Sequence, residues 1–200
     1  TTLLNKNSLS KILKINFQKK VALACLQPET NSIRNTKKII TETLSAISEF
    51  KDITFIFTAP GVDLGSSEII SAIKRFIKKN KNCLFFNSLG GKIYYSMMNQ
   101  VDFIIGNSSS GILEMPSFKK PTINIGKRQL GRIFSKSVIN VSMNKGLIKK
   151  AIKKAIKTNK KTNYKNPYLK SKTSKKITSI VKNLKINKEN HKKFYDIKFN

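Results

Sequence analysis

Residues 101–125 contain two short apolar runs separated by a turn of small residues and a helical segment. The runs at 101–105 and 122–125 are typical of buried strands. The turn at 106–111 reads Gly-Asn-Ser-Ser-Ser-Gly, and the residues at 112–118 are predicted to form a helix. This order of elements is that of a βαβ unit, so the two strands are expected to be parallel.

The same alternation of strands and helices extends over most of the chain. Apolar runs and helical spacing predict further strands at 21–26, 53–57, 83–86 and 138–141, and helices at 33–50, 67–79, 93–99, 146–157 and 174–184. The last helix is expected to turn Ile177, Ile180, Val181 and Leu184 inward. The alternation predicts an α/β fold, with a Rossmann-like parallel sheet and helices on both faces.

The turn at 106–111 is predicted to bind an anion, above all phosphate. It combines free backbone N–H groups, the hydroxyls of Ser108, Ser109 and Ser110, and the N-terminus of the following helix. The alternative is a polar loop in which a serine caps the helix and no ligand binds. The turn alone is compatible with both.

Two kinds of charged residue near the turn favour the ligand site. Glu114 is expected in the first turn of the helix. There a carboxylate either stabilises the positive end of the helix or accepts hydrogen bonds from ribose hydroxyls. Arg128 and Arg132 follow the second strand, where a guanidinium can pair with a phosphate.

Three further loops are expected at the same edge of the sheet as this turn. Gln27, Asp63 and Ser88 each follow a predicted strand. Ligands of open parallel sheets bind outside the carboxyl ends of the strands. The convergence of four loops on that edge therefore predicts one ligand-binding crevice.

The chain is strongly basic, with 40 Lys and Arg against 10 Asp and Glu, which gives a formal net charge of +30. Such a charge suggests nucleic acid or another polyanion as a partner. The lysines, however, are spread over most of the chain together with many Ile and Asn, which points to a general bias in codon usage. We expect non-specific binding to polyanions at low salt but no specific nucleic-acid partner.

Cysteine, histidine and hydropathy patterns exclude several classes of protein. Cys25 and Cys83 lie in apolar runs and are predicted to be buried thiols in a reducing compartment, the cytoplasm. The one histidine, His191, lies close to the last residue, so neither a metal site nor a histidine-based triad is predicted. No run reaches the roughly 18 apolar residues of a membrane span, and no signal peptide is visible.

Residues 106–132, GNSSSGILEMPSFKKPTINIGKRQLGR, resemble the signature of the UDP-N-acetylglucosamine 2-epimerases. They are most similar to the hydrolysing branch that serves sialic acid and legionaminic acid synthesis. Residues 60–67, PGVDLGSS, resemble a Pro-x-x-Asp-x-Gly loop of the family, and 86–95, FNSLGGKIYY, resemble the run before its signature. The resemblance covers residues 20–157. It implies a GT-B-type fold of two Rossmann-like halves, of which this chain is the C-terminal, UDP-binding half.

The resemblance implies contacts with the phosphates of UDP. The diphosphate would lie against Ser108, Ser109, Ser110 and Gly111, all in the serine turn. Arg128 would support the phosphate region. No cofactor and no metal are implied.

The resemblance also implies contacts with the rest of the nucleotide sugar. Glu114 would accept the ribose hydroxyls, and the backbone near Ser88 and Leu89 would meet the uracil. Asp63 and Gly65 would shape the loop beside the sugar. Family members eliminate UDP across the C1–C2 bond of the sugar, and the hydrolysing members then add water. The products are UDP and a 2-epimer such as N-acetylmannosamine.

The family's proton-transferring carboxylates belong to the N-terminal half, so no catalytic residue is expected in this chain, which should be inactive alone. One departure concerns a family His-Pro-x-Thr run, which here reads Gln27-Pro28-Glu29-Thr30. Gln27 cannot take up a proton near neutral pH. A proton-transfer role is therefore weakened, whereas orienting the diphosphate, or a turn without ligand contact, both stay open.

The expected organisation has four parts: a lead-in from a missing N-terminal half at 1–20, the UDP-binding domain at 20–158, a C-terminal crossover and helix at 159–185, and a basic tail at 186–200. The complete enzyme is expected to be a homo-oligomer that binds a UDP-sugar and no membrane. Two alternatives remain: a non-catalytic, stand-alone UDP-sugar module and a basic nucleic-acid-binding protein. The coding sequence upstream of Thr1 would separate the enzyme from the module.

Overall fold

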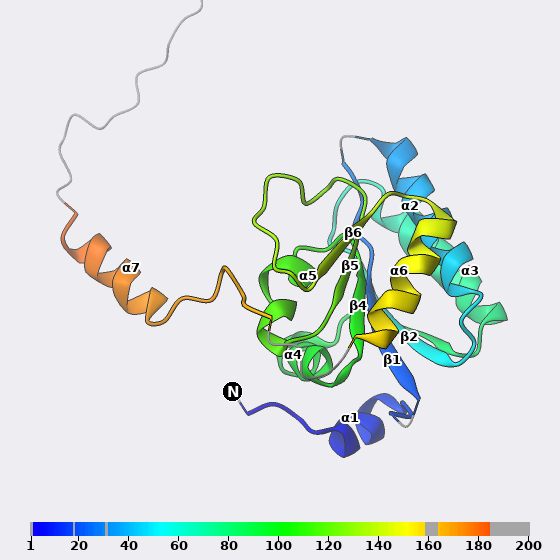
Figure 1. The fold of residues 1–200 in the computed structure, drawn as a ribbon, viewed down its shortest axis with the longest axis horizontal. Helices are drawn as coiled ribbons and strands as arrows, with labels where there is room; N and C mark the ends of the chain where they lie inside the picture. The colour runs from blue at the N-terminus through cyan, green and yellow to red at the C-terminus, as the bar shows by residue number, and fades with distance from the viewer. Residues whose placement is uncertain (1, 18, 31, 159–163, 185–200) are drawn as a thin grey trace, which may run out of the picture. The chain divides into compact units, whose positions relative to one another are not determined.

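The computed structural model describes residues 2–17, 19–30, 32–158 and 164–184 (Figure 1). It divides the chain into two compact units, Thr1–Tyr168 and Leu169–Asn200, which we treat separately. The predicted basic tail at 186–200, with His191, lies outside the described residues. No helix in the described ranges is long and apolar enough to cross a membrane.

The first unit is built on a six-stranded sheet in which every pair of neighbouring strands is parallel. The strands are β1 (Lys20–Cys25), β2 (Ile53–Thr58), β3 (Cys83–Phe86), β4 (Phe103–Gly106), β5 (Thr122–Ile125) and β6 (Val138–Val141). Their order is β3-β2-β1-β4-β5-β6, so the direction of winding reverses between β1 and β4. The predicted parallel α/β sheet is confirmed.

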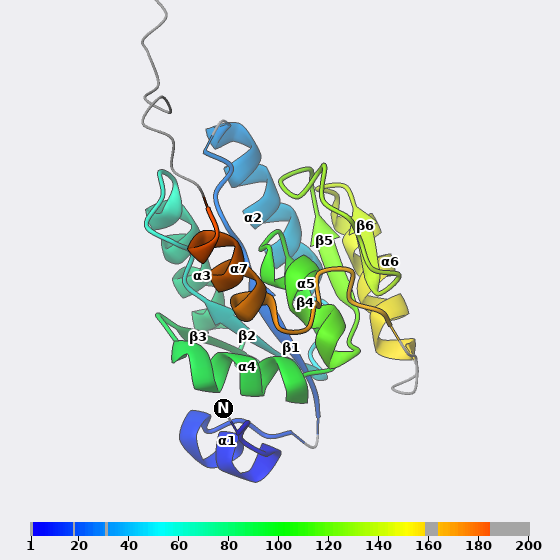
Figure 2. The same ribbon diagram turned by 90° about the vertical axis from the view of Figure 1, so that its left-hand side faces the viewer.

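Helices cover both faces of this sheet (Figures 1 and 2). One face is covered by α2 (Ile33–Ile47), α3 (Ser66–Lys79) and α6 (Lys145–Lys157). The other is covered by α1 (Lys6–Leu13), α4 (Gly90–Gln100) and the 3-10 helix η1 (Met115–Phe118). The predicted lead-in at 1–20 thus contributes a helix, α1, to the core of the first unit.

The strands are apolar on both sides because successive side chains of a strand point to opposite faces. Ala22 and Ala24 of β1 join the core beneath α2, whereas Leu23 joins the core beneath α4. Phe55 of β2 and Phe103 of β4 meet edge to face, with ring centroids 6.3 Å apart and an interplanar angle of 79°. Full burial of a side chain of this kind stabilises the fold by about 1.5–3 kcal/mol.

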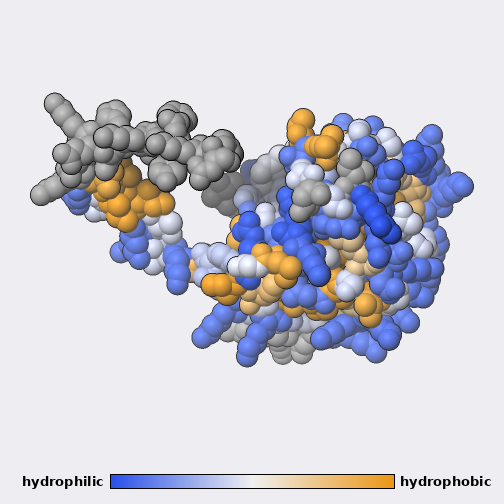
Figure 3. Space-filling model, turned by 90° about the horizontal axis from the view of Figure 1, so that it is seen from above, coloured by the Kyte–Doolittle hydropathy of each residue, from blue (hydrophilic) through white to orange (hydrophobic). Residues whose placement is uncertain are grey.

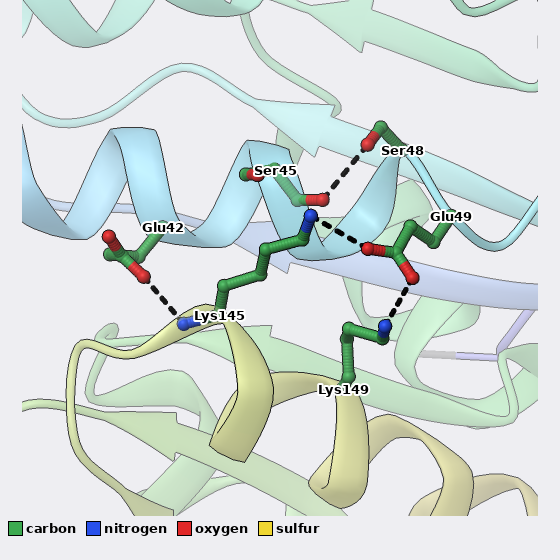
Figure 4. A network of polar contacts seen from close by, with 6 residues as sticks. All are labelled: Glu42, Ser45, Ser48, Glu49, Lys145 and Lys149. Carbon is green, nitrogen blue, oxygen red and sulfur yellow. Dashed lines mark hydrogen bonds and ion pairs between the residues drawn. The ribbon is translucent and has the colours of Figure 1, made fainter.

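Charged residues join α6 to the C-terminal end of α2 (Figure 4). The Glu49 carboxylate pairs with Lys145 at 2.7 Å and also with Lys149. These ammonium groups lower the pKa of Glu49 from its ordinary 4.5 to about 2. The Lys145 backbone N–H also donates to the Glu42 carboxylate. The contacts fix the helix that follows the last strand.

The prediction of one continuous helix at 112–118 is wrong. The structure has a four-residue helix, α5 (Ser110–Leu113), and then η1. Pro116 explains the break, because proline lacks the N–H that a continuous α-helix would require and its ring clashes with the preceding turn. Glu114 therefore lies between the two short helices rather than in a first turn, and the helix-dipole argument for it does not hold.

The second unit contains α7 (Thr173–Lys182), close to the helix predicted at 174–184. The expected inward side chains Ile177, Ile180, Val181 and Leu184 are instead 56–65% exposed. A single short helix has no core of its own in which to bury an apolar stripe, so that expectation is wrong for the described chain.

Apolar side chains are also exposed on two loops of the first unit. Val62 and Leu64 lie between β2 and α3, and Leu130 and Ile133 lie between β5 and β6. On the face of this unit drawn in Figure 3, hydrophobic residues are scattered among hydrophilic ones. Both loops follow the carboxyl end of a strand.

Candidate functional site

A cavity of about 360 Å³ lies at the carboxyl ends of β1 to β4, beside the reversal between β1 and β4. This is the expected position of a ligand in an open parallel sheet. Its lining residues come from four loops and from α4: Cys25, Gln27, Thr58, Ala59, Asn87, Ser88, Leu89, Gly90, Gly91, Tyr94, Tyr95, Ser108, Ser110 and Glu114. The predicted convergence of loops on one edge is borne out.

The cavity wall is uncharged apart from one carboxylate. Of its lining residues, Glu114 is the one acidic side chain and none is a lysine or arginine. Hydroxyl groups of Thr58, Ser108 and Ser110 line it together with two tyrosines. Such a wall suits a neutral, hydroxyl-bearing ligand with an aromatic ring better than it suits a bare polyphosphate.

The buried side of the cavity is formed by Cys25, Thr58 and Tyr94. The Cys25 Sγ lies 3.4 Å from the Thr58 hydroxyl and 3.5 Å from the Tyr94 hydroxyl. Burial raises the pKa of the Cys25 thiol, and burial likewise raises the pKa of Tyr94. Both groups therefore stay neutral near pH 7, as donors and acceptors of hydrogen bonds rather than as charges.

Glu114 faces α4. Its Oε1 accepts a hydrogen bond of 3.3 Å from the Tyr95 hydroxyl. The negative charge of Glu114 raises the pKa of Tyr95. No lysine or arginine within the described ranges forms an ion pair with Glu114. The Glu114 side chain is thus half-buried and accepts a hydrogen bond from a neutral donor.

Asn107, fully buried after β4, ties the serine turn to the loop after β1. Its Oδ1 accepts from the Gln27 N–H at 2.7 Å, and its Nδ2 donates to the Gln27 carbonyl at 2.8 Å. Its backbone carbonyl accepts from Arg128 at 3.1 Å and from Gln129 at 2.8 Å. Arg128 does not line the cavity; its guanidinium instead supports the turn from the outside.

The serine turn differs in part from its prediction. Ser108 and Ser110 line the cavity, whereas Ser109 is the N-cap residue that precedes α5 and Gly111 is buried against Thr122. The N–H of Ser110 donates to the Ser108 hydroxyl, and that of Gly111 donates to the Ser108 carbonyl. The expectation of free N–H groups is therefore wrong for Ser110 and Gly111, whose N–H groups bond within the turn.

The loop after β2 lines the cavity with Ala59 and also contacts Gln27, another lining residue. The Gly61 N–H donates to the Gln27 Oε1 at 3.0 Å. Asp63 is exposed and does not line the cavity, and its backbone carbonyl accepts from the Ser66 N–H. Gly65, the N-cap residue before α3, has φ of 92°, a conformation that favours glycine. Ser88 and Leu89 line the cavity as expected.

The sequence analysis did not single out several residues of this site. Tyr94 and Tyr95 lie in the predicted helix at 93–99, where helical spacing does not reveal which face meets a ligand. Asn107 belongs to a polar turn, and its position directly after a buried strand is the one sequence signal that it anchors a loop. No group of three or more potential metal ligands occurs among the residues that the structure describes.

Comparison with known proteins identifies the family. A family model described as UDP-N-acetylglucosamine 2-epimerase matches residues 2–182. The GDP/UDP-N,N'-diacetylbacillosamine 2-epimerase (hydrolyzing) of Campylobacter jejuni is 37% identical over 142 residues, covering 70% of this chain and 37% of that protein. The polysialic acid biosynthesis protein P7 of Escherichia coli is 41% identical over 131 residues, covering 65% of this chain and 33% of that protein.

Solved structures show the same fold. The UDP-GlcNAc 2-epimerase of Methanocaldococcus jannaschii, in complex with UDP-GlcNAc and UDP, has a TM-score of 0.67 at 18% identity and covers 89% of this chain and 49% of that chain. The UDP-GlcNAc 2-epimerase of Neisseria meningitidis, bound to UDP-GlcNAc, has a TM-score of 0.61 at 19% identity and covers 89% and 48%.

These GT-B-type structures are about twice as long as the part that matches, and this chain matches about a third of the length of the two curated relatives above. The matched family model nevertheless spans nine-tenths of the chain, from α1 to the end of α7. Fold, cavity position and sequence similarity agree, and the chain belongs to the UDP-N-acetylglucosamine 2-epimerase family.

Proposed function

We propose that this chain is the C-terminal, UDP-binding half of a hydrolysing UDP-N-acetylglucosamine 2-epimerase. In this proposal the complete enzyme eliminates UDP from a UDP-2-acetamido sugar and then adds water to the intermediate. The products are UDP and the 2-epimeric sugar. The observation that carries the proposal is the cavity at the switch between β1 and β4, with Glu114 as its one charged lining residue.

The cavity fits the nucleoside part of UDP. A carboxylate that faces hydroxyl-rich surroundings is the usual acceptor for ribose hydroxyls in nucleotide-binding folds. We assign this role to Glu114, with the uracil near Ser88 and Leu89. The two tyrosines of α4 supply apolar ring surface and hydroxyls to the same cavity.

In this proposal the diphosphate lies at the edge of the cavity, against the hydroxyls of Ser108 and Ser110. Gly111 contributes by letting the turn pack tightly, since a Cβ there would lie 2.6 Å from the Thr122 side chain. Arg128 acts by holding the Asn107 carbonyl and by adding positive charge near the turn. Asp63 and Gly65 shape the loop that would face the sugar.

Gln27 takes the place of a family histidine in this proposal and orients rather than transfers protons. Its backbone is fixed by Asn107, and its side-chain carbonyl is fixed by the Gly61 N–H. An amide cannot act as acid or base near neutral pH. The cavity also lacks a second carboxylate to pair with Glu114, so the groups that move the C2 proton are assigned to the N-terminal half.

Calorimetry with UDP at low salt tests the proposal. We expect weak binding by the purified chain and a loss of at least about tenfold in affinity for Glu114→Ala. Glu68→Ala is the matched control, because it removes a carboxylate from α3, outside the cavity. No binding of UDP by the wild-type chain would contradict the proposal.

A second measurement separates the half-enzyme from a complete catalyst. The chain alone is expected to release no UDP from UDP-N-acetylglucosamine, because the proposed acid and base are absent from the cavity. Release of UDP by the purified chain would overturn this assignment. A stand-alone module would bind UDP in the same way, and a native start codon at Thr1 would favour it.

The nucleic-acid alternative is not favoured. Exposed lysines occur on elements of both faces of the sheet, for example Lys92 on α4 and Lys153 on α6, and do not define one binding face. Affinity for DNA or RNA is expected to be non-specific and to fall steeply with salt.

A further inference from the structure

Tyr95 projects from α4 toward Glu114, which lies between α5 and η1. The Tyr95 hydroxyl donates to the Glu114 Oε1 at 3.3 Å, so a contact between two separate elements fixes one oxygen of the carboxylate. Both residues line the cavity. The hydrogen bond therefore lies within the candidate nucleotide site.

The orientation of the Tyr95 side chain is restrained by its neighbour Tyr94. Its ring packs edge to face on the ring of Tyr94, with centroids 6.1 Å apart and an interplanar angle of 74°. Tyr94 is in turn held by the Cys25 thiol. Although Tyr95 is 41% exposed, its ring rests on a side chain that is itself anchored to β1.

The chemistry of the pair matters for ligand binding. A tyrosine hydroxyl orients a carboxylate without neutralising it, whereas a lysine or arginine would compete with the ligand for charge. One bond to Oε1 leaves further lone pairs on both oxygens for other donors. A carboxylate that is oriented before the ligand arrives loses less side-chain freedom on binding.

We propose that Tyr95 is a positioning residue that presents Glu114 to the ribose and so makes the site selective for ribonucleotides over 2′-deoxyribonucleotides. This inference rests on the proposed function, in which Glu114 accepts the ribose hydroxyls. Tyr95 acts through Glu114: it adds affinity where the ligand offers a 2′-hydroxyl and little where that hydroxyl is missing.

The test compares UDP and 2′-deoxy-UDP by calorimetry on the wild-type chain, Tyr95→Phe, Glu114→Ala and the double variant. We expect Tyr95→Phe to lower the affinity for UDP about three- to tenfold and the affinity for 2′-deoxy-UDP clearly less. In the Glu114→Ala background the same change is expected to have no further effect on UDP. Tyr168→Phe is the matched control, since that hydroxyl accepts from the Ile133 N–H away from the cavity.

The outcomes separate the two proposals. Wild-type binding of UDP that depends on Glu114 but is unchanged in Tyr95→Phe overturns the role of Tyr95 and leaves the proposed function standing. Two other results also overturn the role of Tyr95. One is that Tyr95→Phe lowers the affinities for UDP and 2′-deoxy-UDP equally. The other is that Tyr95→Phe lowers the affinity for UDP as much in the Glu114→Ala background as in the wild-type chain. Absence of UDP binding by the wild-type chain contradicts the proposed function itself. Thermal unfolding of each variant checks that the fold is retained.

Discussion

Asn107 and Gln27 are joined by two hydrogen bonds in which the side-chain amide of Asn107 satisfies both backbone groups of Gln27. The N–H of Gln27 donates to Oδ1 at 2.7 Å, and its carbonyl accepts from Nδ2 at 2.8 Å. Gln27 follows β1 and Asn107 follows β4, the two strands between which the sheet reverses. The pair therefore joins the loop after β1 to the loop after β4 at the edge of the sheet where a ligand would bind, and fixes the position of one loop relative to the other.

Asn107→Ala is expected to lower the free energy of unfolding by about 2–4 kcal/mol. The reason is that both backbone groups of Gln27 lose their partner at a partly buried position, and an unsatisfied buried group costs about 1–3 kcal/mol. Urea denaturation measures the loss. Asn99→Ala, at an exposed position of α4, serves as control and should stay within about 0.5 kcal/mol of wild type. A loss below about 1 kcal/mol for Asn107→Ala would show that the two hydrogen bonds between Asn107 and Gln27 contribute little to the stability of the fold.

Gly106→Ala is expected to prevent formation of the native sheet edge. Gly106 has φ of 141°, and a Cβ there would lie 2.0 Å from the Cys25 carbonyl oxygen. Backbone atoms of the neighbouring strand cannot move aside cheaply, so we expect insoluble or strongly destabilised protein. Gly91→Ala is the control: a Cβ there meets nothing within 4 Å, and alanine in the helix α4 should preserve or raise the melting temperature. Normal folding of Gly106→Ala would contradict the conformation given for this turn.

The strands were predictable because each is a short run of apolar residues that is buried on both faces. The parallel arrangement followed from their alternation with helices. The order of the strands was not predictable from periodicity, since spacing says nothing about which strands are neighbours. Pro116 is the signal in the sequence that a continuous helix over 112–118 breaks, because proline lacks the N–H that such a helix needs.

The site was predictable in its position more than in its contacts. Loops that follow parallel strands share an edge, which placed Gln27, Ser88 and Ser108 together. Which way Arg128 points depends on the buried carbonyl of Asn107, and that contact arises only once β4 and β5 pair. Tyr95 enters the site through the orientation of α4, which is set by packing and not by helical spacing.

Glu49→Gln is expected to lower the melting temperature at pH 6 and to have little effect at pH 2. The pKa of Glu49 is lowered from 4.5 to about 2 by Lys145 and Lys149, so the folded state favours the charged carboxylate. Its contribution to stability is complete above the unfolded pKa and is lost as the pH falls from about 4.5 through 2. Thermal melts of both proteins from pH 7 to pH 2 measure this difference.

Salt provides the control for this ion-pair cluster. Glu49 is well exposed, so its attraction to the two lysines is screened, and 1 M NaCl should shrink the difference between wild type and Glu49→Gln at pH 6. A difference that is independent of both pH and salt would mean that Glu49 acts through packing of its side chain and not through its charge.

Both cysteines are expected to react slowly with a thiol reagent such as 5,5′-dithiobis(2-nitrobenzoate) at pH 8. Burial raises the pKa of Cys83 to about 12, at which only about 10⁻⁴ of the thiol is ionised at pH 8, whereas an unfolded cysteine with a pKa near 8.5 is ionised to about a quarter. The native rate at Cys83 should therefore lie orders of magnitude below that in 8 M urea. Burial acts in the same direction on Cys25, although it lines the cavity. The contrary outcome is one thiol that reacts rapidly in native buffer and is missing in Cys25→Ser. It would show that solvent reaches Cys25 through the cavity and that Tyr94 does not keep this thiol buried.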